Sequence, residues 1–239
     1  MPPAATAWPL TPEHPSPLPP PLAQALRTGP LDLATYMAIC LYDPDYGYYN
    51  TRIPMGTDPE QSDFTTAPEL TSAFGEVLAA WLVGQWQAWG RPAVWQVLEL
   101  GPGRGTLLTE VWTTLQHLAP AACLQLQWWA VEISPSLRQC QQAEAKRCEA
   151  RVQWVDTITQ IPASNLPTVV LSNEFFDALP TNQYQRVGNT LRPRLLQWDA
   201  SAQKLHWVLG TEPEVDPTIL AYAAGYPAAG IIEYCPQLP

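Results

Sequence analysis

The feature that most constrains this chain is the run "ELGPGRG" at residues 99–105, which follows the apolar run "AVWQVL" and precedes the helical pattern "GTLLTEVWTTLQHL". Glycine costs backbone entropy on folding, so a cluster of glycines indicates a tight turn or a close approach to the backbone. A strand, a glycine loop and a helix in this order are typical of the ligand loop of an α/β protein. We therefore predict that Gly101, Gly103 and Gly105 bind a ligand, the alternative being that they only turn the chain.

Strand and helix patterns alternate around this loop. Apolar strands are expected at residues 93–100, 124–132, 151–155 and 167–173, and a helix at 134–150 with Ser134 as N-cap and Pro135 in its first turn. This alternation predicts an α/β fold with a parallel sheet covered by helices on both faces. Beyond Pro180, three further runs predict a small antiparallel meander, at residues 182–187, 190–198 and 204–210.

The N-terminal third has a different composition. Residues 1–21 contain nine prolines and are expected to form a flexible tail. A helix ending at Gly29-Pro30 and a second helix capped by Asp32 should follow. The domains expected are therefore a disordered tail at 1–21, a helical and lid region at 22–92, a Rossmann-like core at 93–182, and an antiparallel insertion with the C-terminus at 183–239.

An aromatic loop joins these N-terminal helices to the core. It is rich in Pro, Gly and Asp yet carries several tyrosines, so it is expected either to cover a ligand or to fill the core. Thr66 and Glu69 then form a capping-box pattern. The helix that follows should end at Gly90-Arg91-Pro92, and its expected apolar face comprises Leu70, Phe74, Val77, Leu78 and Trp81.

Composition excludes several classes of protein. The formal net charge of −10 lacks the basic footprint of a nucleic-acid binder. No apolar run reaches the roughly 20 residues that span a bilayer, and no targeting pattern is evident, so we expect no membrane insertion and a cytoplasmic location. The five cysteines contain no CxxC pair and predict reduced, mostly buried thiols rather than disulfides or a metal site.

Acidic residues at the ends of the expected strands indicate which ligand the loop takes. Glu132 ends the second strand and could accept hydrogen bonds from both ribose hydroxyls, and Asp156 after the third strand could accept from an adenine amino group. Glu99 disfavours a pyrophosphate and suits the cationic end of S-adenosylmethionine, whose carboxylate would lie at the helix N-terminus at Gly105-Thr106. For Glu132 and Asp156 the alternatives are an ordinary strand end and turn chemistry.

Five blocks in the same order resemble the MidA family, which are class I S-adenosylmethionine-dependent methyltransferases that include the mitochondrial assembly-factor enzymes of respiratory complex I. The blocks are "YMAICLYDPDYGYY", "SDFTTAPELTSAFGE", "ELGPGRGTL", "VEISPSLR" and "NEFFDALPTNQY", within residues 22–187. The resemblance implies a Rossmann-like class I methyltransferase fold, S-adenosyl-L-methionine as cofactor and methylation of an arginine in a partner protein. It assigns the glycine loop to the cofactor and Glu132 to its ribose.

The block after the fourth strand matches the family segment that faces the transferred methyl group. The resemblance therefore implies that Asn173, Glu174 and Asp177 are catalytic, with Glu174 and Asp177 able to hold a guanidinium by charge-assisted hydrogen bonds. The alternative is that these two carboxylates only cap a helix.

This sequence departs from the family pattern in three places. "TLRPRLL" stands where the family has a Trp-Arg-Glu-like stretch, and "SDF" stands where it has Gly-Asp-Phe. The family pattern also continues well beyond Pro239, so we expect the C-terminal strands that close the sheet to be missing and one sheet edge to be open. The alternatives are a fragment, a shortened gene product, or a part completed by another chain or a homo-oligomer.

Two other functions stay open from the sequence. One is a catalytically silent protein that keeps the adenosine pocket and acts in assembly. The other is an oxidoreductase using a dinucleotide, which Glu99 and the glycine spacing disfavour because the dinucleotide pattern is G-x-G-x-x-G.

Overall fold

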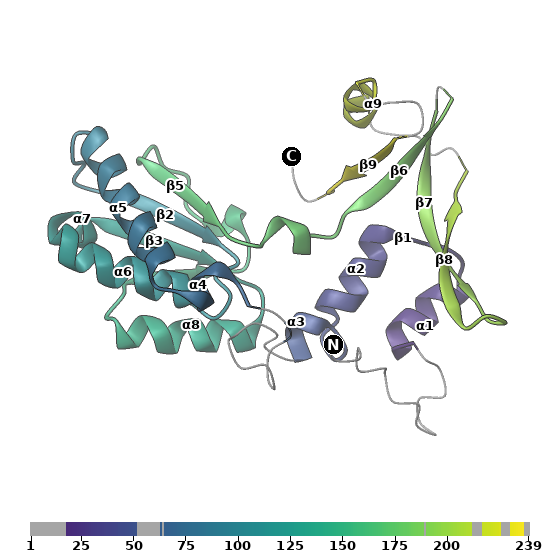
Figure 1. The fold of residues 1–239 in the computed structure, drawn as a ribbon, viewed down its shortest axis with the longest axis horizontal. Helices are drawn as coiled ribbons and strands as arrows, with labels where there is room; N and C mark the ends of the chain where they lie inside the picture. The colour runs from purple at the N-terminus through teal and green to yellow at the C-terminus, as the bar shows by residue number, and fades with distance from the viewer. Residues whose placement is uncertain are drawn as a thin grey trace. The chain divides into compact units, whose positions relative to one another are not determined.

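The computed structural model describes residues 18–51, 63, 65–188, 190–211, 217–225 and 230–236. Most of the expected N-terminal tail lies outside these residues. Contacts group the chain into two units, one formed by Met1–Thr51 with Ala178–Pro239 and the other by Arg52–Asp177. The first unit contains the purple and yellow-green ends of the chain and the second its blue and teal middle (Figure 1). The domain boundaries expected from the sequence stay predictions.

The second unit is built on a four-stranded parallel sheet. Its strand order is β4-β3-β2-β5, with β2 (Trp95–Leu100) and β3 (Leu126–Val131) in the middle and β4 (Val152–Val155) and β5 (Thr168–Ser172) at the edges. All four strands fall where the apolar runs predicted them. The parallel α/β prediction is confirmed, and the carboxyl ends of the four strands meet at one edge of the sheet.

Four described helices of this unit pack on one face of the sheet. They are α5 (Ala73–Ala88), α6 (Thr106–Leu118), α7 (Pro120–Leu124) and α8 (Pro135–Arg147). The core between them and the sheet is rich in tryptophan, with Trp112 of α6 edge-on to Trp128 of β3 at 6.3 Å between ring centroids. The predicted N-cap of α8 is confirmed, since the Ser134 side chain accepts from the backbone N–H of Leu137.

The opposite face of the sheet carries the alternate side chains of each strand. Among them Gln127, Gln153 and Val170 are exposed, while Gln96 is buried and donates to the hydroxyls of Ser164 and Thr168. The buried residues of the described helices of this unit pack on the sheet face that carries Trp95 and Trp128. The sequence predicted helices on both faces, whereas the described helices of this unit cover this face alone and leave Gln127, Gln153 and Val170 exposed on the other.

The prediction for the face of α5 is wrong. Leu70 and Val77 are 71% and 70% exposed, and the buried residues are instead Gly75, Ala79, Leu82 and Trp86. A break at Thr71 and Ser72 separates α4 (Ala67–Leu70) from α5, so the apolar spacing runs across two helices. The side of α5 that carries small residues packs closely on α6. A Cβ on Gly75 would overlap the Glu110 side chain, so only a glycine allows this approach.

The capping box predicted for Thr66 and Glu69 does not form at the start of α4. The Thr66 side chain makes no capping hydrogen bond. Glu69 accepts instead from the hydroxyl of Thr106, at 2.6 Å, so its carboxylate joins α4 to the first turn of α6.

The first unit combines short helices with an antiparallel sheet. Its helices are α1 (Pro20–Arg27), α2 (Leu33–Tyr42), α3 (Tyr48–Thr51) and α9 (Pro217–Ala223). The sheet order is β1-β7-β6-β9 with β8 beside β7, for β1 (Leu31–Asp32), β6 (Asn182–Val187), β7 (Thr190–Asp199), β8 (Lys204–Leu209) and β9 (Ile231–Tyr234). The predicted meander is confirmed, as is Asp32 as the cap of α2, accepting from Thr35 N at 2.7 Å.

The start of the aromatic loop, up to Thr51, packs within the first unit. Tyr49 stacks on Tyr42 at 5.8 Å and meets Tyr48 edge-on at 5.2 Å, and the Tyr42 hydroxyl donates to the Ala178 carbonyl at 2.7 Å. Residues 52–62 and 64 of the loop lie outside the described residues. A covering role for the loop stays a prediction.

Two expectations from composition can be compared with this fold. Among the described residues, no helix combines the length and the apolar character that spanning a bilayer requires. All five cysteines are free, but only Cys123 is buried, so the expectation of mostly buried thiols is wrong. The other four cysteines are partly exposed, and the number of cysteines in a sequence does not reveal their burial.

Candidate cofactor site at the carboxyl ends of the parallel strands

The glycine loop joins β2 to α6 in a left-handed conformation. Gly101, Gly103 and Gly105 have φ angles of +62°, +59° and +88°, a region that side chains disfavour. A Cβ on Gly101 would lie 2.5 Å from Cδ2 of Phe175, and one on Gly105 would lie 3.1 Å from the Cα of Gln141. Two of the glycines are therefore required by close approaches within the protein itself, in addition to any ligand.

Glu132 follows β3 and is held in a fixed orientation. The residue is only 7% exposed; Oε1 accepts from the backbone N–H of Ser134 at 2.9 Å, and Oε2 accepts from Nε2 of Gln141 at 3.0 Å. Burial raises the pKa of Glu132, and the hydrogen bonds from Ser134 and Gln141 oppose that rise by favouring the ionised form. The predicted ribose acceptor is thus a buried, oriented carboxylate.

Gln141 is a residue that sequence reasoning missed. It lies on α8, is fully buried, and donates a second hydrogen bond from Nε2 to the Gly103 carbonyl at 2.8 Å. Its Oε1 accepts from Nε1 of Trp154 on β4 at 3.0 Å. One signal could have found it, because Leu137, Gln141 and Ala145 recur every four residues and form the buried stripe of α8.

Asp156 follows β4 and lies at the surface. Its carboxylate accepts from Arg138 of α8 at 2.7 Å, and the same guanidinium also donates to the Glu132 carbonyl. The Asp156 side chain is 60% exposed, so it keeps access to solvent while Arg138 ties it to the end of β3. Its role as an adenine acceptor stays a prediction, and Arg138 was not foreseen.

Glu99 lies inside the protein rather than at its surface. It is 3% exposed on the face of the sheet that packs on the helices, and Oε2 accepts from Nε1 of Trp128 at 3.0 Å. Burial raises the pKa of Glu99 to about 7, and the Trp128 hydrogen bond only partly opposes this. A direct attraction between this carboxylate and a cationic ligand stays a prediction.

The predicted catalytic residues follow β5. Glu174 has a φ of +52°, which is uncommon for a residue with a side chain and typical of strained functional positions. Asp177 lies in a short 3-10 turn, Phe176–Ala178, and both carboxylates belong to exposed residues, whereas Asn173 is half-buried. Phe175, between them, is the residue that packs on Gly101.

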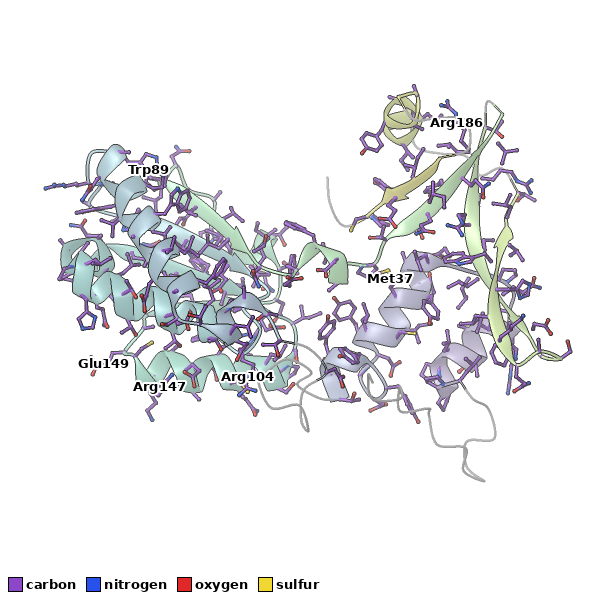
Figure 2. All side chains as sticks on the ribbon, viewed as in Figure 1. Met37, Trp89, Arg104, Arg147, Glu149 and Arg186 are labelled. Atoms are coloured by element: carbon purple, nitrogen blue, oxygen red, sulfur yellow. The ribbon has the colours of Figure 1, made fainter. Side chains whose placement is uncertain are left out.

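These contacts bring most of the predicted site together. The glycine loop, Glu132 and Asp156 are linked through Gln141 and Arg138, and Phe175 joins the block after β5 to the same loop. Figure 2 shows Arg104 of the loop toward the N-terminal end of α8, and Arg147 and Glu149 toward its other end. Chemically, this edge offers oriented carboxylates, left-handed backbone and the N-terminus of α6, which suits a ligand carrying hydroxyl and carboxylate groups.

Comparison with known proteins gives the same picture from sequence and from structure. Residues 77–238 match the model of a family described as "Putative S-adenosyl-L-methionine-dependent methyltransferase". A protein arginine methyltransferase NDUFAF7 homolog of Drosophila melanogaster, named as mitochondrial, is 35% identical over 186 residues, covering 69% of this chain and 41% of that protein. The Xenopus laevis protein arginine methyltransferase NDUFAF7, also named as mitochondrial, is 32% identical over 77% of this chain and 46% of its own length.

A solved structure extends the likeness to the fold. A Burkholderia thailandensis protein crystallised with S-adenosyl-homocysteine superposes with a TM-score of 0.69 and 27% identity, covering 90% of this chain and 55% of that chain. The chain spans about half the length of the proteins that it matches.

One expectation from the sequence is overturned here. A cytoplasmic location was expected from the lack of a targeting pattern, but the relatives are named as mitochondrial proteins. The lack of an evident targeting pattern was therefore a poor guide to location.

Proposed function

This chain belongs to the S-adenosyl-L-methionine-dependent methyltransferase family that its sequence matches, and we propose on this premise that it binds S-adenosylmethionine and methylates an arginine of a partner protein. The observation that carries the proposal is the oriented Glu132 carboxylate beside a left-handed glycine loop at the carboxyl ends of β2 and β3. The names of the relatives support arginine as the acceptor, and the bound S-adenosyl-homocysteine of the structural neighbour supports the cofactor.

The residues present fit the cofactor. An ionised carboxylate offers about four acceptor positions. Glu132 accepts from Ser134 on Oε1 and from Gln141 on Oε2, and a backbone hydrogen bond from Ile133 also favours its ionised form, so the acceptor capacity that remains is available to the hydroxyls of a ribose. Asp156 would accept from the adenine amino group, and the loop with the start of α6 would hold the carboxylate of the amino-acid part.

The cofactor supplies an electrophilic methyl group on a sulfonium, and the chain supplies alignment and charge. Glu174 and Asp177 would hold the guanidinium of the acceptor arginine by charge-assisted hydrogen bonds and take up the proton that its nitrogen loses. Asn173 would orient the same group through its side-chain amide. Both carboxylates belong to exposed residues, which a substrate as large as a protein can reach.

Titration calorimetry with S-adenosylmethionine, S-adenosyl-homocysteine and NAD tests the binding step. We expect the first two to bind and NAD not to bind. Equal affinity for NAD would overturn the cofactor assignment and favour the oxidoreductase alternative.

Transfer of a labelled methyl group from S-adenosylmethionine to a protein, with arginine and lysine variants of the labelled position, tests the acceptor. This assay should be run on a version of the protein as long as its relatives as well as on this chain. Binding without transfer in both would favour the catalytically silent alternative.

A further inference from the structure

We propose that Gln141 is the positioning residue of this site, which sets the orientation of the Glu132 carboxylate and fixes the glycine loop against it. The inference rests on the proposed function, because the carboxylate that Gln141 orients is the one proposed to bind the ribose of the cofactor. It adds a residue of α8 to a site otherwise made from the ends of strands.

The hydrogen bonds of Gln141 leave its amide one orientation. The Trp154 indole N–H can only donate, so the group that it meets at 3.0 Å must be the amide oxygen. The amide nitrogen then faces two acceptors, the Gly103 carbonyl at 2.8 Å and Glu132 Oε2 at 3.0 Å. All the donors and one lone pair of the amide are thereby used in a fully buried position.

The glycine loop is shaped to admit this side chain. Gly105 lacks a Cβ that would lie 3.1 Å from the Gln141 Cα and 3.4 Å from its Cγ, so α8 can come close to the loop at this position. Loss of the amide would leave a buried carboxylate oxygen, a carbonyl and an indole N–H without their partner. The loop, the end of β3 and β4 are therefore held together through one side chain.

The charges around Gln141 make a neutral donor important. Glu132 faces it from the end of β3, Arg138 and Glu144 lie on α8 itself, and Asp156 follows β4. A donated hydrogen bond favours the ionised form of Glu132, which is the form that accepts from two hydroxyls. A carboxyl in place of the amide would keep the shape of the side chain but reverse this effect.

Gln141→Glu therefore gives a distinctive test. Two carboxylates at 3.0 Å resist ionising together, so cofactor affinity should become steeply pH-dependent. We expect S-adenosyl-homocysteine to bind roughly ten- to a hundred-fold more weakly than to the wild type at alkaline pH, and the loss to shrink as the pH falls and one proton is shared by the two carboxylates. Calorimetric titration at several pH values measures it.

Matched variants separate positioning from general damage. Gln142→Glu adds the same charge at the exposed neighbouring position of α8 and should leave the affinity and its pH profile unchanged. Gln141→Met keeps the size, removes all three hydrogen bonds and should weaken binding by roughly ten-fold. Because Glu132 then loses a bond that favours its ionised form, any added pH dependence should run opposite to that of Gln141→Glu, with weaker binding at low pH. Trp154→Phe removes the bond that orients the amide, together with part of the indole that packs against the core, and should weaken binding several-fold.

Each outcome decides between the hypotheses. Wild-type protein that does not bind S-adenosyl-homocysteine would refute the proposed function. Wild-type binding with equal affinity in folded Gln141→Glu and Gln141→Met variants would refute the positioning role alone. If thermal unfolding shows that the Gln141 variants do not fold, Trp154→Phe decides, and unchanged affinity in that variant overturns the proposal.

Discussion

Two sets of carboxylates lie at the same edge of the parallel sheet and are built in opposite ways. Glu132, after β3, is 7% exposed and hydrogen-bonded through both oxygens, whereas Glu174 and Asp177, after β5, belong to exposed residues. A small cofactor benefits from a rigid, desolvated acceptor whose orientation is already set. A protein substrate needs a reachable one, so the difference matches the two roles proposed here.

The backbone separates the two sets as well. Glu132 follows regular extended strand, but Glu174 has a φ of +52°, which costs roughly 1–2 kcal/mol for a residue with a side chain. The contact between Phe175 and Gly101 holds the segment in place. Rigidity thus comes from a polar network on one side and from packing around a strained residue on the other.

The largest expected effect is at the loop between the two sets. Gly103→Val should abolish binding of S-adenosylmethionine while leaving the fold intact, because a β-branched residue resists the φ of +59° and would occupy the space of the cofactor. Calorimetry reports the binding and circular dichroism the fold. Gly84→Val, on α5 where nothing lies within 4 Å of an added Cβ, is the control and should bind normally. Retained binding in folded Gly103→Val would show that the loop is only a turn.

The next effect concerns Glu99, the most buried carboxylate near this edge. Its pKa of about 7 in the folded protein lies above the ordinary value of 4.5, so the folded protein holds a proton that the unfolded chain has released between these values. The free energy of unfolding should therefore fall as pH rises through this window, by about 3 kcal/mol in total, and level off above it. Glu99→Gln should remove that contribution.

Urea unfolding of both proteins at several pH values checks this, and the difference between them isolates Glu99 from Glu132, whose pKa is raised as well. Parallel stability curves for Glu99→Gln and wild type would mean that Glu99 ionises normally.

The two carboxylate sets themselves should fail in different ways. Glu132→Ala should cost about 1.5–3 kcal/mol of cofactor binding, or roughly ten- to a hundred-fold in affinity, because it removes an acceptor of two ribose hydroxyls. Glu174→Ala should leave binding unchanged and slow methyl transfer. Titration calorimetry measures the first, and a transfer assay on a version as long as the relatives measures the second. Loss of binding in Glu174→Ala, or none in Glu132→Ala, would reverse the assignment.

The smallest effect tests the strain at Glu174. Glu174→Gly should stabilise the fold by about 0.5–1 kcal/mol, since relief of the left-handed conformation outweighs the backbone entropy that glycine adds. Glu149→Gly is a matched control, because Glu149 has a φ of +57° beyond the far end of α8 (Figure 2). Both should raise the thermal midpoint, but only Glu174→Gly should slow transfer. Equal transfer rates in the two variants would leave Glu174 without a catalytic role.

The sequence by itself determined the features that depend on neighbours along the chain. The four parallel strands, the cap of α2 by Asp32 and the cap of α8 by Ser134 were all predicted, since periodicity and capping act over a few residues. The glycine loop and Glu132 were placed at strand ends for the same reason.

Only the tertiary structure decided which groups meet across the fold. It turned the small-residue side of α5 toward α6, buried Glu99 against Trp128, and placed Gln141 between Gly103, Glu132 and Trp154. In the sequence, Gly103 lies 38 positions from Gln141, Trp154 lies 13 and Glu132 lies nine. Trp128 lies 29 positions from Glu99. Their pairing is set by strand order and by the closeness of helix packing, which local patterns do not encode.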